Sequence, residues 1–219
     1  MARNFAEIAF TESVKARQEQ SGSRQQYARM NRLARGTTLT LAEIEFITRR
    51  DSFYLATVGE NGYPYVQFRG GPPGFLRVMD AQTLGYADFR GNRQYITVGN
   101  LSRNDRAALI VMDYANRSRL KLYARIEIVE AKDGAELMAR LRVPGYDVQL
   151  ERAMLLHVEA FDWNCPQHIT PRFTMEEIQS MTAPLHEHVA KLERELARLR
   201  RMPSTCGERQ ANTADDQAE

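Results

Sequence analysis

The sequence predicts a mainly β fold with flanking helices, built as a small antiparallel barrel. Short segments rich in aromatic and β-branched residues follow one another between residues 52 and 161, whereas helical patterns lie mainly at the margins. The dipeptide Asn61-Gly62, inside the turn GENG, joins the first two segments and is a strong signal for a tight hairpin. Many short strands at close spacing are typical of a sheet that closes on itself.

The first 35 residues have a helical pattern. Apolar residues such as Phe5 and Ile8 recur at helical spacing, and Arg and Gln fill many of the other positions. Ser21-Gly22-Ser23 interrupts this pattern, so two helical pieces are expected. Together they form a predicted N-terminal helical segment over residues 1–39.

A capping box marks the beginning of the main domain, which is expected over residues 40–173. Thr40 and Glu43 have the spacing of this motif and precede the apolar residues Ile44 and Ile47, so a helix should begin at Thr40. Within the domain, the sequence predicts strands at 52–58, 63–69, 75–79, 83–88, 106–113, 119–130 and 150–161, and helices at 92–102 and 133–142.

The chain changes character after residue 173. Five apolar residues follow at alternating spacings of four and three, with Glu, Lys and Arg between them, which predicts a helix over residues 174–202. This helix could pair as a coiled coil or lie on its own barrel. The polar stretch 203–219 has no apolar periodicity and is expected to be disordered. The five residues are Leu185, Val189, Leu192, Leu196 and Leu199.

Composition limits the partners of this chain. Lys and Arg number 30 against 28 Asp and Glu, giving a net charge of +2 and no strong field toward nucleic acid or membrane. No apolar run approaches the ~18 residues of a membrane span, and the N-terminus lacks the plan of a signal peptide. Cys165 and Cys206 are far apart, so a disulfide is not expected. We therefore expect a reduced, cytoplasmic protein.

Few side chains indicate catalysis. The four histidines show no metal-ligand spacing, and neither a nucleophile elbow nor a phosphate loop is present, so no metal site is expected. Cys165 and His168 are three residues apart, but a structural Cys-Pro loop is the commoner case. Any chemistry is therefore expected to belong to a bound cofactor.

Three segments carry cations or amides, two of them beside glycine. Gln67 and Arg69 share a strand face that leads into Gly70-Gly71. Residues 90–94 read RGNRQ where a strand gives way to a helix, a pattern that suits an anion. Arg119, Lys121 and Tyr123 alternate along a third strand. These residues could be solvated surface charges or an anion site; nucleic acid is disfavoured because no aromatic stacking platform accompanies them.

Four motifs, in this order and spacing, resemble the pyridoxamine 5′-phosphate oxidase-like family of FMN-binding split barrels. They are LATVGENGYPYVQFRGGPPGF, LGYADFRGNRQY, NDRAALIVMD and RLKLYARIEIVE, and the resemblance extends over residues 40–173. RGGPPGF and RGNRQ are similar to the branch of predicted flavin-nucleotide-binding proteins in that family. The resemblance implies a six-stranded antiparallel split β-barrel that forms a homodimer with FMN between the subunits and acts as an oxidoreductase on a small molecule.

The resemblance also implies site residues. Gln67 stands where the classical oxidases have an Arg that contacts FMN, and Arg119 where they have a Gln from the second subunit. The Arg-Lys pair that grips the phosphate falls on Arg93 and Gln94, so the Lys is missing. The expected cofactor-binding residues are Gln67, Arg69, Gly70, Tyr86, Ala87, Asn92, Arg93, Gln94 and Arg119, and His168 and Arg172 are expected to line the cleft for a substrate.

The substrate is not implied. The classical oxidases end in a Trp-Gly-Gly segment that binds pyridoxal phosphate, whereas residues 174–219 form the predicted helix and polar tail instead. A flavin-binding sensor or carrier without turnover therefore stays open as the alternative. In either case FMN is expected in preference to FAD, because the anion site near Arg93 suits one terminal phosphate.

The run FRGGPPGF at residues 68–75 has more special residues than a tight turn needs. One hypothesis is that bare Gly70-Gly71 and rigid Pro72-Pro73 let the flat flavin ring lie against backbone. The alternative is a β-bulge that closes the barrel.

Overall fold

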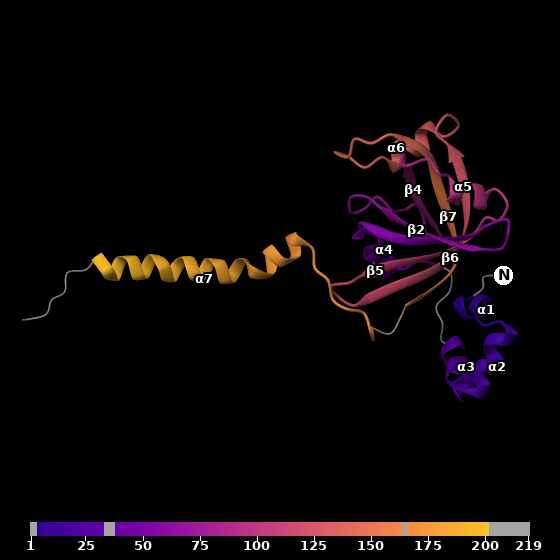
Figure 1. Ribbon diagram of the computed structural model, residues 1–219, viewed down its shortest axis with the longest axis horizontal. Coiled ribbons are helices and arrows are strands. Elements are labelled where there is room, and N and C mark those ends of the chain that lie inside the picture. The colour runs from indigo at the N-terminus through magenta and orange to yellow at the C-terminus, as the bar shows by residue number, and fades with distance from the viewer. Residues whose placement is uncertain (1–3, 33–37, 164–165, 202–219) are drawn as a thin grey trace, which may run out of the picture. The chain divides into compact units, whose positions relative to one another are not determined.

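The computed structural model describes residues 4–32, 38–163 and 166–201 (Figure 1). The chain divides into two compact units, residues 1–172 and 173–219. The expectations for Cys165, Cys206 and the tail 203–219 lie outside the described residues. The helices are α1 (Phe5–Ala9), α2 (Glu12–Gln20), α3 (Arg24–Arg32), α4 (Leu41–Thr48), α5 (Ile96–Leu101), α6 (Ala135–Leu141) and α7 (Met175–Arg201). The strands are β1 (Ser52–Val58), β2 (Pro64–Gly70), β3 (Arg77–Val78), β4 (Thr83–Phe89), β5 (Arg106–Asp113), β6 (Ser118–Glu130) and β7 (Leu150–Trp163).

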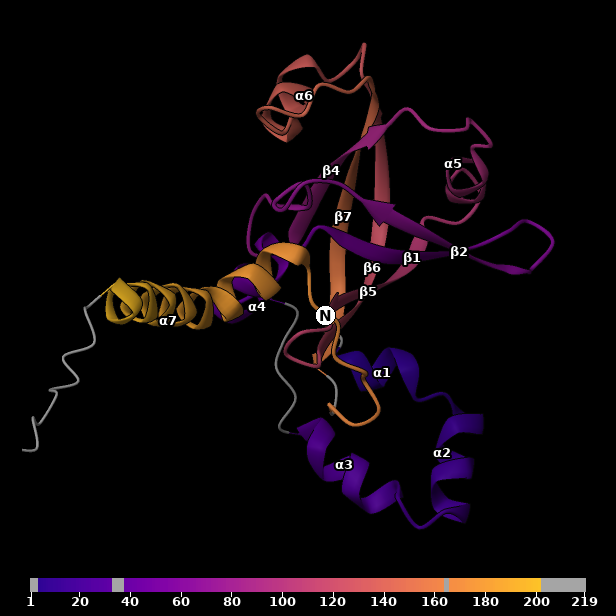
Figure 2. The same ribbon diagram turned by 60° about the vertical axis from the view of Figure 1, so that its left-hand side comes forward.

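All seven strands form one antiparallel sheet in the order β2-β1-β5-β6-β7-β4-β3. In Figures 1 and 2, β1 and β2 run across the long strands β6 and β7. The predicted fold class is confirmed: the fold is mainly β, with an antiparallel sheet and helices at its margins. Its seventh strand, β3, has only two residues and pairs with β4.

The sheet curls until its two ends approach each other. β2 is one edge and β4 lies next to the other edge, so no backbone ladder joins them. An ion pair connects these two strands instead: Arg69 Nη1 of β2 lies 2.7 Å from Asp88 Oδ1 of β4. The barrel is therefore split between β2 and β4, and side chains bridge the split.

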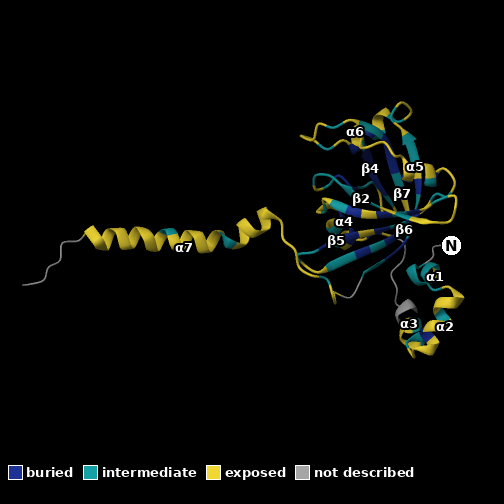
Figure 3. Ribbon diagram, viewed as in Figure 1, coloured by how far each residue is buried: buried dark blue, intermediate teal, exposed yellow. Residues whose placement is uncertain are grey.

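One face of the curled sheet forms the core, and its strands alternate as a half-buried sheet requires. Phe53, Leu55, Leu109 and Val111 on β1 and β5 are all at most 1% exposed. Figure 3 shows exposed stretches of the sheet in yellow. The neighbours of these core residues along β1, β5 and β2 point outward and include several apolar side chains. Those that are at least one-third exposed are Tyr54, Val58, Val66, Phe68 and Ile110, called below the outer apolar face.

Helix α4 is fixed to the sheet by Glu43, which is 0% exposed. Its carboxylate accepts hydrogen bonds from the Thr40 N–H at 2.9 Å and from Trp163 Nε1 on β7 at 2.7 Å. Phe46 packs edge-on against Trp163, with ring centroids 4.7 Å apart. The predicted capping box is present. It also binds the helix to the last strand, which the local sequence does not indicate.

The glycine-rich run has a packing role. A Cβ atom on Gly71 would lie 2.7 Å from Phe75 Cγ and 2.9 Å from Phe89 Cε2. The Gly71 N–H donates to the Asp51 carbonyl at 2.9 Å, so it is not available to a ligand. The β1–β2 register continues without a shift to Gly70, so the bulge considered as the alternative does not interrupt this pairing. The protein's own aromatic rings take up the space beside Gly71.

Two elements are much shorter than predicted. The strand expected at 75–79 is reduced to Arg77–Val78, because the Phe75 N–H turns back to the Pro72 carbonyl at 3.0 Å. The helix expected from residue 92 begins at Ile96, because Arg93 and Tyr95 have positive φ angles. Within the part of the chain that the structure describes, we find no helix with the length and apolar character needed to cross a membrane.

Candidate functional site

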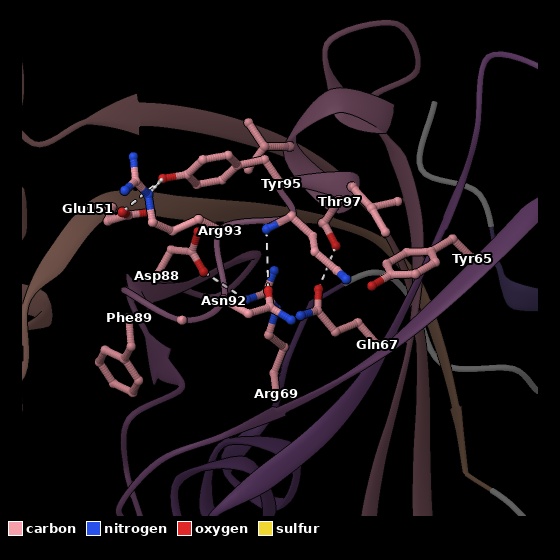
Figure 4. Close-up of a pocket in the computed structure, with 14 residues that line it drawn as sticks. Tyr65, Gln67, Arg69, Asp88, Phe89, Asn92, Arg93, Tyr95, Thr97 and Glu151 are labelled. Carbon is pink, nitrogen blue, oxygen red and sulfur yellow. Dashed lines mark hydrogen bonds and ion pairs between the residues drawn. The ribbon is translucent and has the colours of Figure 1, made fainter.

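A pocket opens where β2, the turn after β4 and helix α5 meet (Figure 4). Its volume is about 60 Å³, far below the ~300–1,000 Å³ of most small-molecule sites. This pocket by itself is therefore too small for a ligand of ordinary size. The residues that line it are Tyr65, Gln67, Arg69, Asp88, Phe89, Gly91, Asn92, Arg93, Gln94, Tyr95, Ile96, Thr97, Val98 and Glu151.

The turn after β4 holds an unusual backbone conformation. Arg93 has φ 62° and Tyr95 has φ 52°, so two non-glycine residues within three positions are left-handed. Such residues are uncommon, and they cluster at functional sites where the surrounding structure enforces them. Here the Gln94 N–H donates to Asn92 Oδ1 at 3.3 Å, within the turn.

Side chains lock the same turn. Arg93 Nε donates to the Tyr95 hydroxyl at 3.2 Å, and this hydroxyl donates to Glu151 Oε1 on β7 at 3.0 Å. The hydrogen bond to Tyr95 raises the pKa of Arg93 above its ordinary value, so the guanidinium stays charged. Among the described residues, no carboxylate forms an ion pair with Arg93 within 4.0 Å. Arg93 therefore offers a positive charge at the pocket without a direct ion pair to any described residue, although the nearby Glu151 also helps to raise its pKa.

Gln67 projects from β2 toward the same turn (Figure 4). Its Oε1 accepts a hydrogen bond from Thr97 Oγ1 at 2.8 Å, and Thr97 is only 2% exposed. Because the Gln67 oxygen already accepts from the buried Thr97 hydroxyl, the orientation of the amide is fixed. Its NH₂ group is then the part that can donate to a ligand. A Gln at this position can thus donate to a ligand, although it brings no charge.

Arg69 is held differently from Arg93. Asp88 lies between two guanidinium groups, accepting from Arg69 Nη1 at 2.7 Å and from Arg152 Nη1 at 2.9 Å. The Asp88 side chain is 7% exposed and those of Arg69 and Arg152 are 16% and 10% exposed. Arg152 Nη2 also lies 3.3 Å from Glu151 Oε2. The charge of Arg69 is therefore largely balanced inside the protein.

A second, adjoining pocket of about 140 Å³ lies on the other side of Arg69. Besides Arg69, three predicted site residues line it: Gly70, Tyr86 and Ala87. The Tyr86 side chain is 2% exposed, and burial raises the pKa of its hydroxyl, which stays neutral. Neither the Tyr86 hydroxyl nor Arg69 Nε has a hydrogen-bond partner among the described residues. The methyl group of Ala87 packs in the apolar cluster beneath α6.

The remaining predicted residues lie elsewhere. Arg119 is on β6, next to the buried Leu120 and opposite Met112, so it points away from the core. The Arg172 guanidinium lies 5.0 Å from the ring centroid of Tyr114, beyond the end of β5. Arg119, His168 and Arg172 are not among the described residues that line either pocket.

Sequence reasoning missed Asp88, Tyr95, Thr97 and Glu151. A lone acid in the otherwise apolar segment LGYADF could have indicated Asp88, because a buried carboxylate needs a cation. Tyr95 and Glu151 are 56 positions apart, and no local pattern relates them. In the described ranges, no group of three or more His, Cys, Asp or Glu residues is placed to hold a metal ion.

The comparison with protein families gives one match. The model of the pyridoxamine 5′-phosphate oxidase family matches residues 40–159, more than half of the 219 residues. This range contains every residue that lines the two pockets. No curated protein sequence matches the chain.

Solved structures resemble the chain more distantly. A protein from Lactobacillus delbrueckii, described as a candidate pyridoxamine 5′-phosphate oxidase, is 22% identical over 57% of this chain and 94% of its own, with a TM-score of 0.45. A protein of the pyridoxinephosphate oxidase family from Clostridium acetobutylicum is 21% identical (61% and 92% covered, TM-score 0.41). An FMN-binding protein from Syntrophomonas wolfei is 15% identical (56% and 86% covered, TM-score 0.43). Similarities of this size carry no argument about the site or its ligand.

Proposed function

Because the chain belongs to the pyridoxamine 5′-phosphate oxidase family, we propose that it binds FMN at the two adjoining pockets and acts as an oxidoreductase on a small molecule. The observation that carries this proposal is the turn at residues 92–95. It presents the cation Arg93, which has no direct ion pair among the described residues, on a backbone that is left-handed at Arg93 and Tyr95. An anionic group such as a terminal phosphate is the natural partner of such a turn.

The donors around the pockets fit such a cofactor. Arg93 would hold the phosphate, with the amides of Asn92 and Gln94 beside it. The NH₂ group of Gln67, the Tyr86 hydroxyl and Arg69 Nε are donors for the polar atoms of the rest of the molecule. FMN would supply electron or hydride transfer, and the protein would bind and orient it.

A flavin carrier or sensor without turnover is the second candidate. It is favoured because both carboxylates of the pocket are already engaged by other side chains. Asp88 is engaged by Arg69 and Arg152, and Glu151 by Tyr95 and Arg152, so neither is poised as a proton acceptor. Reduction by NADH or NADPH, followed by reoxidation with a panel of acceptors, distinguishes the two functions.

We propose further that two copies form a homodimer through the outer apolar face. Val66 and Phe68 there are 61% and 58% exposed, which is unusual for contiguous apolar side chains on a monomer. These two adjoining pockets are too small for FMN on their own. Arg119 lies on the face of β6 away from the core and lines neither pocket, so it would reach a cofactor held with a second chain, as the family resemblance implies.

We predict that Arg93→Ala weakens FMN binding by roughly 10- to 100-fold, the scale of one lost charged hydrogen bond. Calorimetric titration of the apoprotein with FMN and with FAD measures this, and the wild type should bind FMN more tightly. Arg49→Ala is the matched control, because Arg49 is exposed and lines neither pocket. An unchanged dissociation constant for Arg93→Ala would mean that the phosphate lies elsewhere.

A further inference from the structure

Helix α7 carries a continuous apolar stripe. It is 27 residues long, and none of its residues is buried. Figure 3 shows it as exposed along most of its length. Exposed leucines at regular spacing are costly in water, so a stripe of this length indicates an absent partner. The most exposed members are Met175 (65%), Leu185 (61%), Leu199 (56%), Leu196 (53%) and Leu192 (46%).

The stripe is longer than the five residues visible in the sequence pattern, and Thr182 is its one polar member. Its residues fall on two positions of a heptad repeat, a and d, and cover almost four heptads. Leucine fills most d positions, and a β-branched residue stands at two of the four a positions, a combination typical of parallel two-stranded coiled coils. The a residues are Met175, Thr182, Val189 and Leu196, and the d residues are Ile178, Leu185, Leu192 and Leu199.

Pro184 lies within the helix but does not interrupt this seam. It occupies position c of the repeat, directly before the d residue Leu185, and so faces away from the stripe. A proline inside a helix removes one backbone hydrogen bond and bends the axis. The heptads from Leu185 to Arg201 follow this point without another break.

The charges beside the stripe favour a second copy in the same direction. In a parallel pair, position g of one helix faces position e of the next heptad of the other. Glu195 then meets the partner's Arg200, and His188 meets the partner's Glu193. In the antiparallel register that pairs Leu185 with the partner's Leu196, Arg200 faces Gln179 and only histidine–glutamate contacts remain. The parallel pair therefore keeps an ion pair that is charged at every physiological pH.

We propose that α7 pairs with α7 of a second copy as a parallel, in-register, two-stranded coiled coil. This pairing does not depend on flavin binding. Isolated helices of this length are marginal in water, but tethering to a dimeric barrel would raise the effective concentration of the second helix into the millimolar range. The coiled coil would then hold the two chains together even where the barrel contact alone is weak.

Disulfide trapping tests this proposal in the full-length protein. In a Cys165→Ser, Cys206→Ser background, Leu185→Cys and Leu196→Cys are made separately and oxidised mildly. The parallel pair places each cysteine against its own copy, so both variants should form cross-linked dimers. Ala190→Cys at position b is the matched control and should not cross-link. Cross-links only in a mixture of the two variants would show the antiparallel pair in which Leu185 faces Leu196, and none above the control would overturn the proposed parallel pair.

Light scattering of the full-length double variant Leu192→Glu, Leu196→Glu separates this proposal from the barrel dimer. The two charges should abolish the disulfide trapping at Leu185→Cys when they are combined with it. If trapping persists at the wild-type rate, the stripe is not the contact. If trapping is lost and the variant remains a dimer, both interfaces exist. If trapping is lost and the variant becomes a monomer, the coiled coil is confirmed and the proposed barrel dimer is wrong.

Discussion

Asp88→Ala should lower the free energy of unfolding by about 3–5 kcal/mol, the scale measured when one partner of a buried ion pair is removed. Asp88 accepts hydrogen bonds from Arg69 on β2 and Arg152 on β7, so its loss leaves two poorly exposed guanidinium groups without their common carboxylate. The Arg69 contact also bridges the split of the barrel. Urea unfolding at neutral pH, followed by circular dichroism, measures the change.

Asp162→Ala is the control for this prediction. Asp162 pairs with Lys121 at 2.9 Å, but both side chains are partly exposed, at 43% and 30%. An ion pair of this kind contributes about 1 kcal/mol or less. If Asp88→Ala proves no more destabilising than Asp162→Ala, the bridge across the split is not a principal element of stability.

Glu43→Ala should destabilise the fold by about 2–3 kcal/mol, because it leaves Trp163 Nε1 and the first turn of α4 without their acceptor. Burial raises the pKa of Glu43, but hydrogen bonds from Thr40, Trp163 and the backbone outweigh it, so the net pKa is below the ordinary 4.5. A lowered folded-state pKa contributes stability above the unfolded-state value, and this contribution is lost as pH falls through the folded-state pKa. The difference between wild type and variant should therefore shrink in acid.

Urea unfolding at neutral pH and at several acidic pH values tests both the loss of stability in Glu43→Ala and its dependence on pH. Glu45→Ala on the same helix is the matched control, since Glu45 is 64% exposed and pairs with Arg49 at the surface. Its effect should stay within about 1 kcal/mol at every pH. A difference between Glu43→Ala and wild type that grows on acidification would contradict the assigned direction of the pKa.

The parts of the fold that depend on local chemistry could be predicted from sequence. The Asn61-Gly62 signal predicts the hairpin that the structure has, with Gly62 at φ 84° and β1 paired to β2 from Val58 and Pro64 onward. The capping box places the beginning of α4 at Thr40. In both cases the residues that determine the conformation lie within a few positions of one another.

The parts of the fold that depend on contacts between distant segments of the chain could not be predicted from the sequence. The left-handed residues Arg93 and Tyr95 delay helix α5, and the Tyr95 hydroxyl reaches Glu151, which follows far along the chain. Arg69 looked like a cation for a ligand, but Asp88 balances it from a strand with which β2 does not pair. The family resemblance supplied Gln67 and Arg93 as site residues, and the structure brings these two to one pocket.

The visible absorption spectrum of the purified full-length protein tests the central claim most directly. We predict the two bands of oxidised flavin at about one flavin per chain, with FMN recovered after denaturation. If the protein is purified colourless, FMN added to it should restore the bands. A colourless protein that also fails to bind added FMN would contradict the proposed function.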